Sequence, residues 1–271
     1  WAVRIRRIAL VTLALVSLLF ILDLRCGPQL GQEQSSVRFD VRPRLPIESQ
    51  ASKTQRFSRP QGGLVSLVLD GSYGTVQIKS GTGEELVVSA AVLAQTEEDL
   101  ERVQVVETVT DSEISYGLAV SDGMLPDQVG VGYQVEVPAG MEVAVQYSHG
   151  KVEIEDFVGY LRLVTRFCSV EVRGLAGSLS VDNQFGNLKL EEIAGPLTLD
   201  DAFATSTVQL LAIDGGYDFQ IEVSNGTLSG DAPVERQAQR DMITAAGSTG
   251  AGRHPVAIRS TFGSVTVNLE R

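Results

Sequence analysis

Four oxygen-bearing side chains are the residues of this sequence whose types and spacing best suit chemistry. Asp182 and Asn183 form one neighbouring pair, and Asp200 and Asp201 form a second pair further along the chain. If the chain forms a stacked repeat whose length equals the separation of these two pairs, the four residues lie on adjacent strands of the stack. Their oxygens then come within several ångströms of one another. Such oxygens bind hard cations such as Ca²⁺, and neighbouring carboxylates can act as acid and base on a polysaccharide. A turn at a repeat corner uses the same residue types, so we assign none of them a catalytic, metal or cofactor role.

Other reactive side chains are scarce. The chain holds two histidines, His149 and His254, and two cysteines, Cys26 and Cys168. Two cysteines rule out a disulfide scaffold and a cysteine-based zinc site, and two histidines leave little for imidazole catalysis or a multi-histidine metal centre. The glycine-rich stretch 247–252 lacks the lysine of a phosphate-binding loop and is interpreted as a mobile loop. We therefore predict a non-enzymatic protein without a cofactor.

A repeat with a period of about 18 residues dominates the second half of the chain. Alternating apolar residues follow it, as in the column Leu161, Leu179 and Leu197. Alternation places apolar side chains on one face of a short strand, and no single repeat can bury that face alone. We predict an all-β fold, a parallel β-solenoid with about 18 residues per coil, most regular over residues 145–216. A tripeptide with a central aromatic or histidine residue marks each coil: Ser148-His149-Gly150, Arg166-Phe167-Cys168, Gln184-Phe185-Gly186 and Ala202-Phe203-Ala204.

The period also predicts the surroundings of single residues. His149 stands in the column of the phenylalanines, where we interpret it as the polar end of an aromatic stack. Cys168 replaces a turn glycine beside that stack and is predicted to be a buried or half-buried free thiol. Leu179 should be buried between two coils. On the outward side Glu171 lies above Lys189, which predicts a solvated charge ladder worth roughly 0.2–1 kcal/mol per pair.

The flanks of the regular repeats carry other patterns. Thr96 precedes three acidic residues, as an N-cap precedes the first turn of a short helix. Residues 231–253 lack a strand pattern and are predicted to form a long loop before a closing pair of strands. Longer alternating runs predict strands at 86–92, 103–109 and 133–137.

Charge is distributed unevenly along the chain. The formal net charge is −12, yet residues 1–60 hold ten Lys/Arg and only four Asp/Glu. Residues 61–271 hold thirty Asp/Glu and twelve Lys/Arg. An acidic folded part repels nucleic acid phosphates, so nucleic acid is excluded as a partner.

The N-terminal segment has the pattern of a membrane anchor. Arg4, Arg6 and Arg7 precede the uncharged run 8–22, which places the N-terminal end in the cytoplasm and the bulk of the chain outside. We predict a single-pass anchor at 1–26, a flexible linker at 27–62 that is rich in Gln, Ser, Pro and Arg, and the β-solenoid domain at 63–271. A cleaved signal peptide and a lipoprotein modified at Cys26 are the alternatives.

From residue 63 onward the sequence resembles the bacterial putative-adhesin family of β-strand-repeat envelope proteins, a domain of unknown function. The resemblance rests on the opening segment 64–78, the acidic stretch 96–102, the run 133–138 that leads into the repeats, and the closing segment 258–265. It implies a β-helix outside the membrane, often behind an N-terminal anchor and sometimes linked to envelope-stress systems. It implies no catalytic residues.

Three functions fit these observations. The first is an interaction, adhesion or scaffold module of the bacterial cell envelope, held at the cytoplasmic membrane by its N-terminal helix. Its partner would be an envelope protein or a cell-wall polysaccharide. The second, which rests on the resemblance, is an accessory component of an envelope-stress sensing system. The third is a carbohydrate-active β-helix enzyme, for which only the cluster at residues 182–201 offers acids.

Overall fold

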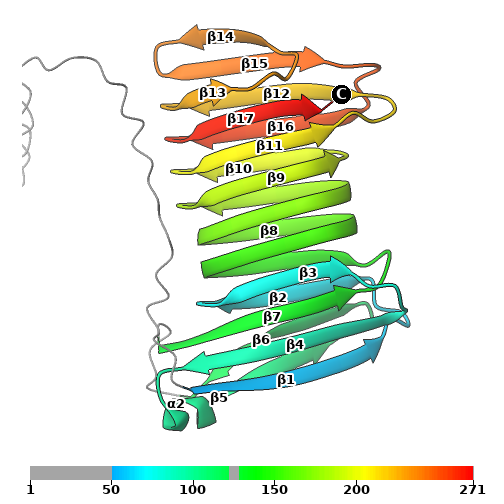
Figure 1. The fold of residues 1–271 in the computed structure, drawn as a ribbon, viewed down its shortest axis with the longest axis vertical. Coiled ribbons are helices and arrows are strands. Elements are labelled where there is room, and N and C mark those ends of the chain that lie inside the picture. The colour runs from blue at the N-terminus through cyan, green and yellow to red at the C-terminus, as the bar shows by residue number, and fades with distance from the viewer. Residues whose placement is uncertain (1–50, 122–127, 271) are drawn as a thin grey trace, which may run out of the picture. The chain divides into compact units, whose positions relative to one another are not determined.

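The chain folds almost entirely into β-strands. The computed structural model describes residues 51–121 and 128–270, and its seventeen strands in these ranges belong to one mixed sheet (Figure 1). The strands are β1 (Ala51–Pro60), β2 (Ser66–Ser72), β3 (Thr75–Ser80), β4 (Glu85–Ala94), β5 (Val103–Val109), β6 (Glu113–Val120), β7 (Val129–Val137), β8 (Glu142–Gln184), β9 (Asn187–Ala194), β10 (Leu197–Ala202), β11 (Thr205–Leu211), β12 (Tyr217–Ser224), β13 (Thr227–Ser229), β14 (Glu235–Gln239), β15 (Met242–Ser248), β16 (His254–Thr261) and β17 (Ser264–Glu270). A short helix, α2 (Glu97–Glu101), lies between β4 and β5.

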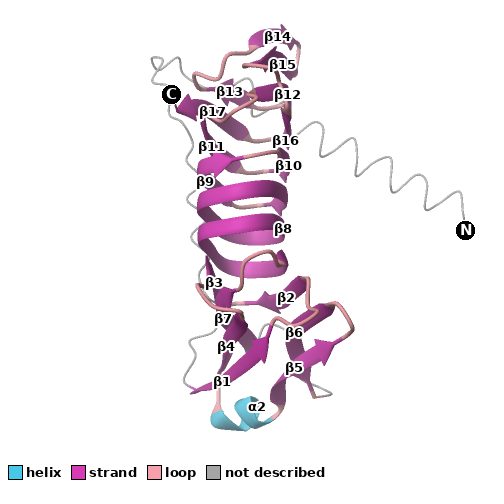
Figure 2. Ribbon diagram, turned by 90° about the vertical axis from the view of Figure 1, so that its right-hand side faces the viewer, coloured by secondary structure: helices cyan, strands magenta, loops and turns pink. Residues whose placement is uncertain are grey.

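Strand pairing divides the sheet into two faces with the core between them (Figure 2). The β10 face runs β5-β6-β2-β8-β10-β16-β12-β15-β14. The β9 face runs β1-β4-β7-β3-β8-β9-β11-β17-β13. The 43 residues of β8 wind through both faces in successive turns, so one coil of chain contributes one strand to each face.

The predicted register is confirmed where β8 meets its neighbours. Val170 of β8 pairs with Leu188 of β9, and Leu179 of β8 pairs with Leu197 of β10. Both pairings are parallel, and all four side chains are buried. Apolar side chains therefore stack above like side chains, which is how coils that cannot bury their own apolar face become stable.

Glycines make one corner of the coil narrow enough for this stacking. Gly177 has a φ of +146°, and a Cβ at this position would lie 2.0 Å from the carbonyl oxygen of Gly159 one coil away. Gly195 repeats the arrangement against Gly177, with a distance of 2.1 Å. A side chain at this corner would force the coils apart, since no Cβ fits there.

Aromatic rings form the opposite corner. Neighbouring rings stack with centroids 4.7–5.1 Å apart. His149 lies in this stack, but Tyr73 covers its other side, so the prediction that it ends the stack is wrong. The coil formed by β2 and β3 extends the column beyond His149, because β2 and β3 both pair in parallel with β8. In spatial order the stack, called here the aromatic ladder, consists of Tyr73, His149, Phe167, Phe185, Phe203 and Phe262.

The C-terminal strands do not stack in the order of the sequence. Within the region 145–216, predicted to be the most regular, β8, β9, β10 and β11 pair in parallel in the order of the sequence. β12 follows this region and does not pair with β10. Instead β16 lies between them, and Val256 pairs with Leu197 on one side and Phe219 on the other. On the other face β17 lies between β11 and β13. The last two strands thus form a coil inserted between two earlier ones, and Phe262 continues the aromatic ladder beyond Phe203.

Two predictions about irregular segments are wrong. Within the predicted loop 231–253, β14 and β15 form an antiparallel pair. Within the predicted linker 27–62, β1 pairs antiparallel with β4, from Ala51 opposite Ala94 to Pro60 opposite Glu85. All five residues of β14 are exposed, and β1 is mostly exposed. Backbone hydrogen bonds hold such edge strands, so apolar alternation does not reveal them.

The predicted short helix is present. The side chain of Thr96 accepts a hydrogen bond of 3.1 Å from the backbone N–H of Asp99 and caps α2. In residues 51–121 and 128–270 no helix is long and apolar enough to cross a lipid bilayer. The predicted anchor at 1–26 lies outside the described residues.

Candidate functional site

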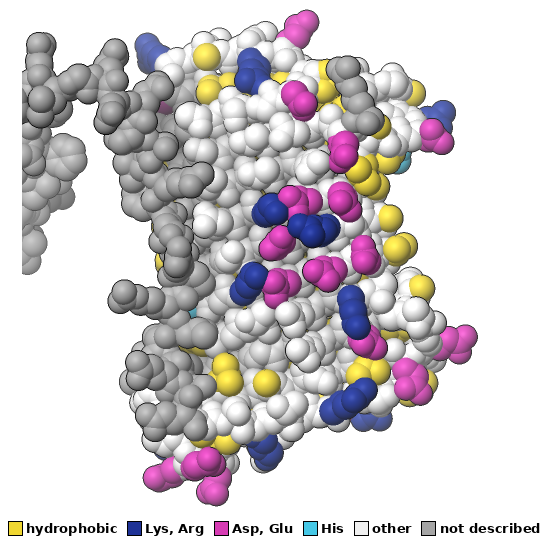
Figure 3. All heavy atoms as spheres, viewed as in Figure 1, with side chains coloured by type: hydrophobic (Ala, Val, Ile, Leu, Met, Phe, Trp, Pro, Cys, Tyr) yellow, Lys and Arg dark blue, Asp and Glu magenta, His cyan; other side chains and the backbone are white. Residues whose placement is uncertain are grey.

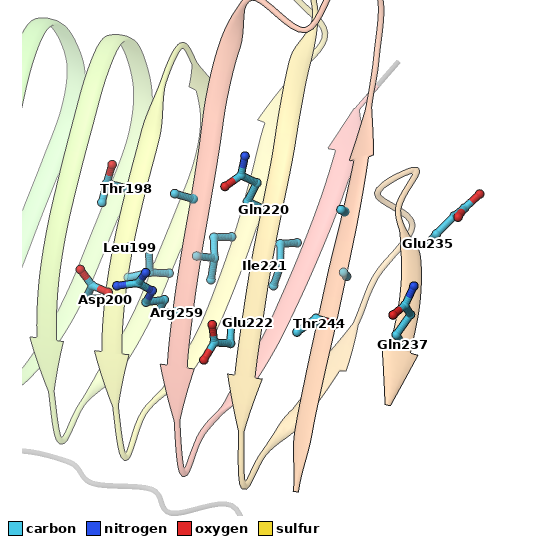
Figure 4. A pocket seen from close by; sticks show the side chains of 14 residues that line it. Thr198, Leu199, Asp200, Gln220, Ile221, Glu222, Glu235, Gln237, Thr244 and Arg259 are labelled. Atoms are coloured by element: carbon cyan, nitrogen blue, oxygen red, sulfur yellow. The ribbon is translucent and has the colours of Figure 1, made fainter. Parts of the chain in front are cut away.

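A groove lies on the outer side of the β10 face, where the inserted coil meets its neighbours. It has a volume of about 570 Å³ and is lined by β10, β16, β12, β15 and β14 (Figure 4). Ligand sites of proteins commonly measure about 300–1,000 Å³. The insertion of β16 creates this surface, because it brings together segments from residue 198 to residue 259.

One row of charged and polar side chains crosses the groove. Asp200 pairs with Arg259, and Arg259 pairs with Glu222 on the next strand. Figure 4 shows the side chain of Arg259 extending from β16 toward Asp200, with Glu222 on the strand at the other side of β16. Within the described chain no ion pair joins Arg259 to either acid. The row, called here the charged row, continues through Thr244 and Gln237.

A second row provides the floor of the groove. Thr198 pairs with Ala257, and Ala257 pairs with Gln220. Gln220 in turn pairs with Ala246. Ala257 and Ala246 are exposed, and their small side chains leave space above the sheet between larger polar neighbours.

The lining sets the kind of ligand that the groove can accept. Asp200, Glu222 and Glu235 are acidic and only Arg259 is basic. Ionised carboxylates only accept hydrogen bonds, a guanidinium only donates them, and amides do both. The groove therefore favours a ligand that donates many hydrogen bonds, accepts a few and carries no negative charge.

The four residues singled out from the sequence do not converge. Asp182 and Asp200 are exposed on the outer side of the β10 face, whereas Asn183 and Asp201 are buried inside. Successive residues of a strand point to opposite sides, so adjacent rungs form two separate pairs, Asp182 with Asp200 outside and Asn183 with Asp201 inside. A four-ligand cation site is excluded by this geometry. Within the described residues no group of three or more His, Cys, Asp or Glu side chains could hold a metal ion.

The two inward members belong to a polar column inside the core, called here the interior polar ladder. Thr165 Oγ1 donates to Asn183 Oδ1 at 2.9 Å, and Ser206 Oγ donates to Asp201 Oδ2. Three of its buried atoms, Asn183 Nδ2, Asp201 Oδ1 and Ser260 Oγ, have no hydrogen-bond partner in the described part of the chain. Burial raises the pKa of Asp201, and the hydrogen bond from Ser206 only partly opposes this.

The remaining candidate residues show no sign of reactivity. Cys168 is a buried free thiol, as predicted, and burial raises its pKa to about 11. It is therefore protonated at neutral pH and poorly nucleophilic. A ring nitrogen of His254 lies 3.1 Å from the backbone oxygen of Asp214. Cys26 lies outside the described residues.

Sequence reasoning missed most of the groove. Only Asp200 was singled out, whereas Arg259 and Glu222 were not. Their outward positions in alternating runs could be seen, but their proximity depends on the insertion of β16, which no period in the sequence indicates.

No protein-family model and no curated protein sequence matches the chain. Among solved structures it is similar to a putative cell adhesion protein from Clostridium sporogenes, with 11% identity, 81% of this chain and 100% of that chain covered, and a TM-score of 0.48. It is also similar to a putative adhesin from Bacteroides fragilis, with 11% identity, 82% and 98% coverage, and a TM-score of 0.42. A putative adhesin from Parabacteroides merdae follows with 12% identity, 82% and 97% coverage, and a TM-score of 0.28.

Proposed function

We propose that the chain is a membrane-anchored, extracytoplasmic β-solenoid that acts as a non-enzymatic interaction, adhesion or scaffold module in the bacterial cell envelope. The observation that carries this proposal is the groove on the β10 face, an open polar surface whose charged row is not neutralised by internal ion pairs. A surface of this kind is suited to holding a partner.

The parallel register supports the solenoid. Leu179 pairs with Leu197 and Val170 with Leu188, each one coil further along the chain, and the glycine corner and the aromatic ladder keep the same step. A stack of such coils presents long lateral faces made of regular rows of outward side chains. Solenoids commonly use extended surfaces of this type for binding.

The arrangement of the acids favours binding over hydrolysis. Glycosidases place two carboxyl groups on either side of the scissile bond, about 5–9.5 Å apart. Asp200 and Glu222 lie on strands that are separated by β16, so the strand that carries Arg259 runs between the two acids. Arg259 stands between them, in the space that a scissile bond would need.

The location outside the membrane is supported by the basic residues that precede the apolar run 8–22. It predicts that protease added to intact spheroplasts removes the folded domain. A cytoplasmic marker protein should survive the same treatment, and a known external domain should be cut. Survival of the folded domain beside a cleaved external control would contradict the proposed orientation.

The interaction itself can be tested by sedimentation. We expect the full chain in detergent to sediment with purified cell-wall material or with solubilised envelope proteins coupled to beads. A chain that stays in the supernatant with both would contradict the proposed function.

A further inference from the structure

We propose that the groove on the β10 face binds an uncharged, extended β-1,4-linked glycan that runs across the strands with about one sugar per strand. This inference rests on the proposed function, because it names the ligand of the same interaction module. It goes further by fixing the chemistry, the direction and the contact residues of that ligand.

Spacing is the first argument. Neighbouring strands lie about 4.7–4.9 Å apart, and the groove spans the five strands β10, β16, β12, β15 and β14. One sugar in an extended β-1,4-linked chain has nearly the same length as this spacing. A glycan that crosses the strands therefore meets a similar set of side chains at each step.

Hydrogen-bond chemistry is the second argument. Asp200 and Glu222 can accept from sugar hydroxyls, and Arg259 between them can donate to ring, hydroxyl or carbonyl oxygens. Gln220 and Gln237 can do both. Because no ion pair within the described chain engages Arg259 with either acid, a ligand need not break one to reach these groups.

Shape is the third argument. Ala257 and Ala246 are exposed and lie two strands apart, with Gln220 between them. Above each alanine the floor is low, and a pyranose ring can approach the sheet. The distance between the two low positions, about 9–10 Å, matches a disaccharide repeat of an extended β-1,4-linked glycan.

Charge and topology disfavour polyanions and peptide strands as occupants. Three carboxylates against one guanidinium repel polyanions such as nucleic acids and acidic polysaccharides. A peptide strand would bind by adding to a sheet edge. The groove lies on a sheet face, and the backbones of β16 and β12 already pair on both sides.

The test is titration calorimetry of the full chain in detergent with two probes, the hexasaccharides of glucose and of N-acetylglucosamine in β-1,4 linkage. We expect at least one of them to bind. Arg259→Ala and Ala257→Gln should each weaken that binding at least tenfold, the first by removing a donor and the second by filling a low position in the floor.

Two matched controls lie outside the groove. Ala119 is an exposed alanine of β6 on the same face, and Arg173 is an exposed arginine of the other face. Ala119→Gln and Arg173→Ala should leave the affinity unchanged. Ala246→Gln serves as a second floor variant, and urea unfolding of each variant verifies that it is folded.

The outcomes separate the two proposals. Binding that is insensitive to both floor variants would overturn the groove assignment, as would preferential binding of an anionic polysaccharide. If neither hexasaccharide binds while the chain still sediments with envelope material, the glycan inference fails and the proposed function stands. If the chain sediments with nothing, the proposed function fails as well.

Discussion

The coils built by β8 and β9 and the coils built by β12 to β17 repeat the same two-faced unit, but they treat outward charges differently. On the β9 face Arg173 lies 2.8 Å from Glu191, and Lys189 lies 2.8 Å from Glu191 and 3.5 Å from Glu171. Figure 3 shows acidic and basic side chains intermingled on this face. These charges neutralise one another, whereas in the groove no ion pair of the described chain joins Arg259 to its acidic neighbours. Charges that are already paired are typical of a sheet face exposed to solvent, whereas charges without an internal ion pair can interact with a bound partner.

The interiors differ in the same direction. Between β8 and β9 the inward positions are apolar, as at Val172 and Leu190. The interior polar ladder begins in β8, at Thr165 and Asn183, but two of its three unsatisfied atoms, Asp201 Oδ1 and Ser260 Oγ, lie toward the inserted coil. Each unsatisfied buried polar atom costs about 1–3 kcal/mol. The regular coils should therefore supply more of the stability than the coils that carry the groove.

The largest expected effect comes from the regular coils. Leu179 is 2% exposed and pairs with Leu197 of the next coil. Leu179→Ala should lower the free energy of unfolding by about 2–5 kcal/mol, as is usual for a buried leucine. Urea unfolding of the full chain, followed by circular dichroism, measures this loss.

Ser180 provides the control for that substitution. It follows Leu179 on the same strand and points outward, so Ser180→Ala should change the free energy of unfolding by less than about 0.5 kcal/mol. An effect at position 180 as large as that at 179 would show that the inward and outward sides have been assigned wrongly.

A smaller effect of opposite sign is expected at the interior polar ladder. Burial raises the pKa of Asp201 above its ordinary value of 3.8. Below that value the aspartate is protonated in both the folded and the unfolded chain, and burial of a charge costs nothing. As the pH rises, the unfolded chain loses the proton first, and the stability contributed by the protonated form is lost through the folded-state pKa.

Asp201→Asn removes this dependence. At pH 7 the variant should unfold at a higher urea concentration than the unaltered chain, by less than the shift that Leu179→Ala produces in the other direction. The difference should shrink as the pH falls toward 4, because the unaltered side chain then becomes neutral as well. A difference that is constant with pH, or a less stable variant at pH 7, would contradict the account of the interior polar ladder.

The sequence reveals those parts of the fold in which each residue meets a counterpart at a constant step. The column through Leu179, the ladder members Phe167, Phe185 and Phe203, and the buried thiol of Cys168 were all predicted on this basis. Alternation also implied that Asp200 and Asp201 point to opposite sides, but the repeat alone had grouped them as one cluster. The insertion of β16 could not be predicted, because no constant step along the sequence links Val256 to its neighbours Leu197 and Phe219. Its consequence, the approach of Arg259 to Asp200 and Glu222, was therefore hidden too.

The smallest expected effect is at the paired charges of the β9 face. Arg173 and Lys189 share Glu191, so Lys189 still accompanies this acid after Arg173→Ala. The Arg173 side chain is 51% exposed, and exposed ion pairs contribute little because water and salt screen them.

We therefore expect no measurable change in the urea midpoint of Arg173→Ala at physiological ionic strength. At about 0.01 M salt, where the Debye length is roughly 30 Å and exposed charges are screened less, we expect only a slight decrease. Arg259→Ala should likewise leave the midpoint unchanged, since no internal partner in the described chain depends on it, while it should weaken hexasaccharide binding at least tenfold. A loss at Arg173 that is large and independent of salt would mean that the charge ladder holds the coils together. The two sets of charges would then differ in their contribution to folding stability as well as in whether they form internal ion pairs. The absence of ion pairs around Arg259 would then no longer be enough to identify the groove as a binding surface.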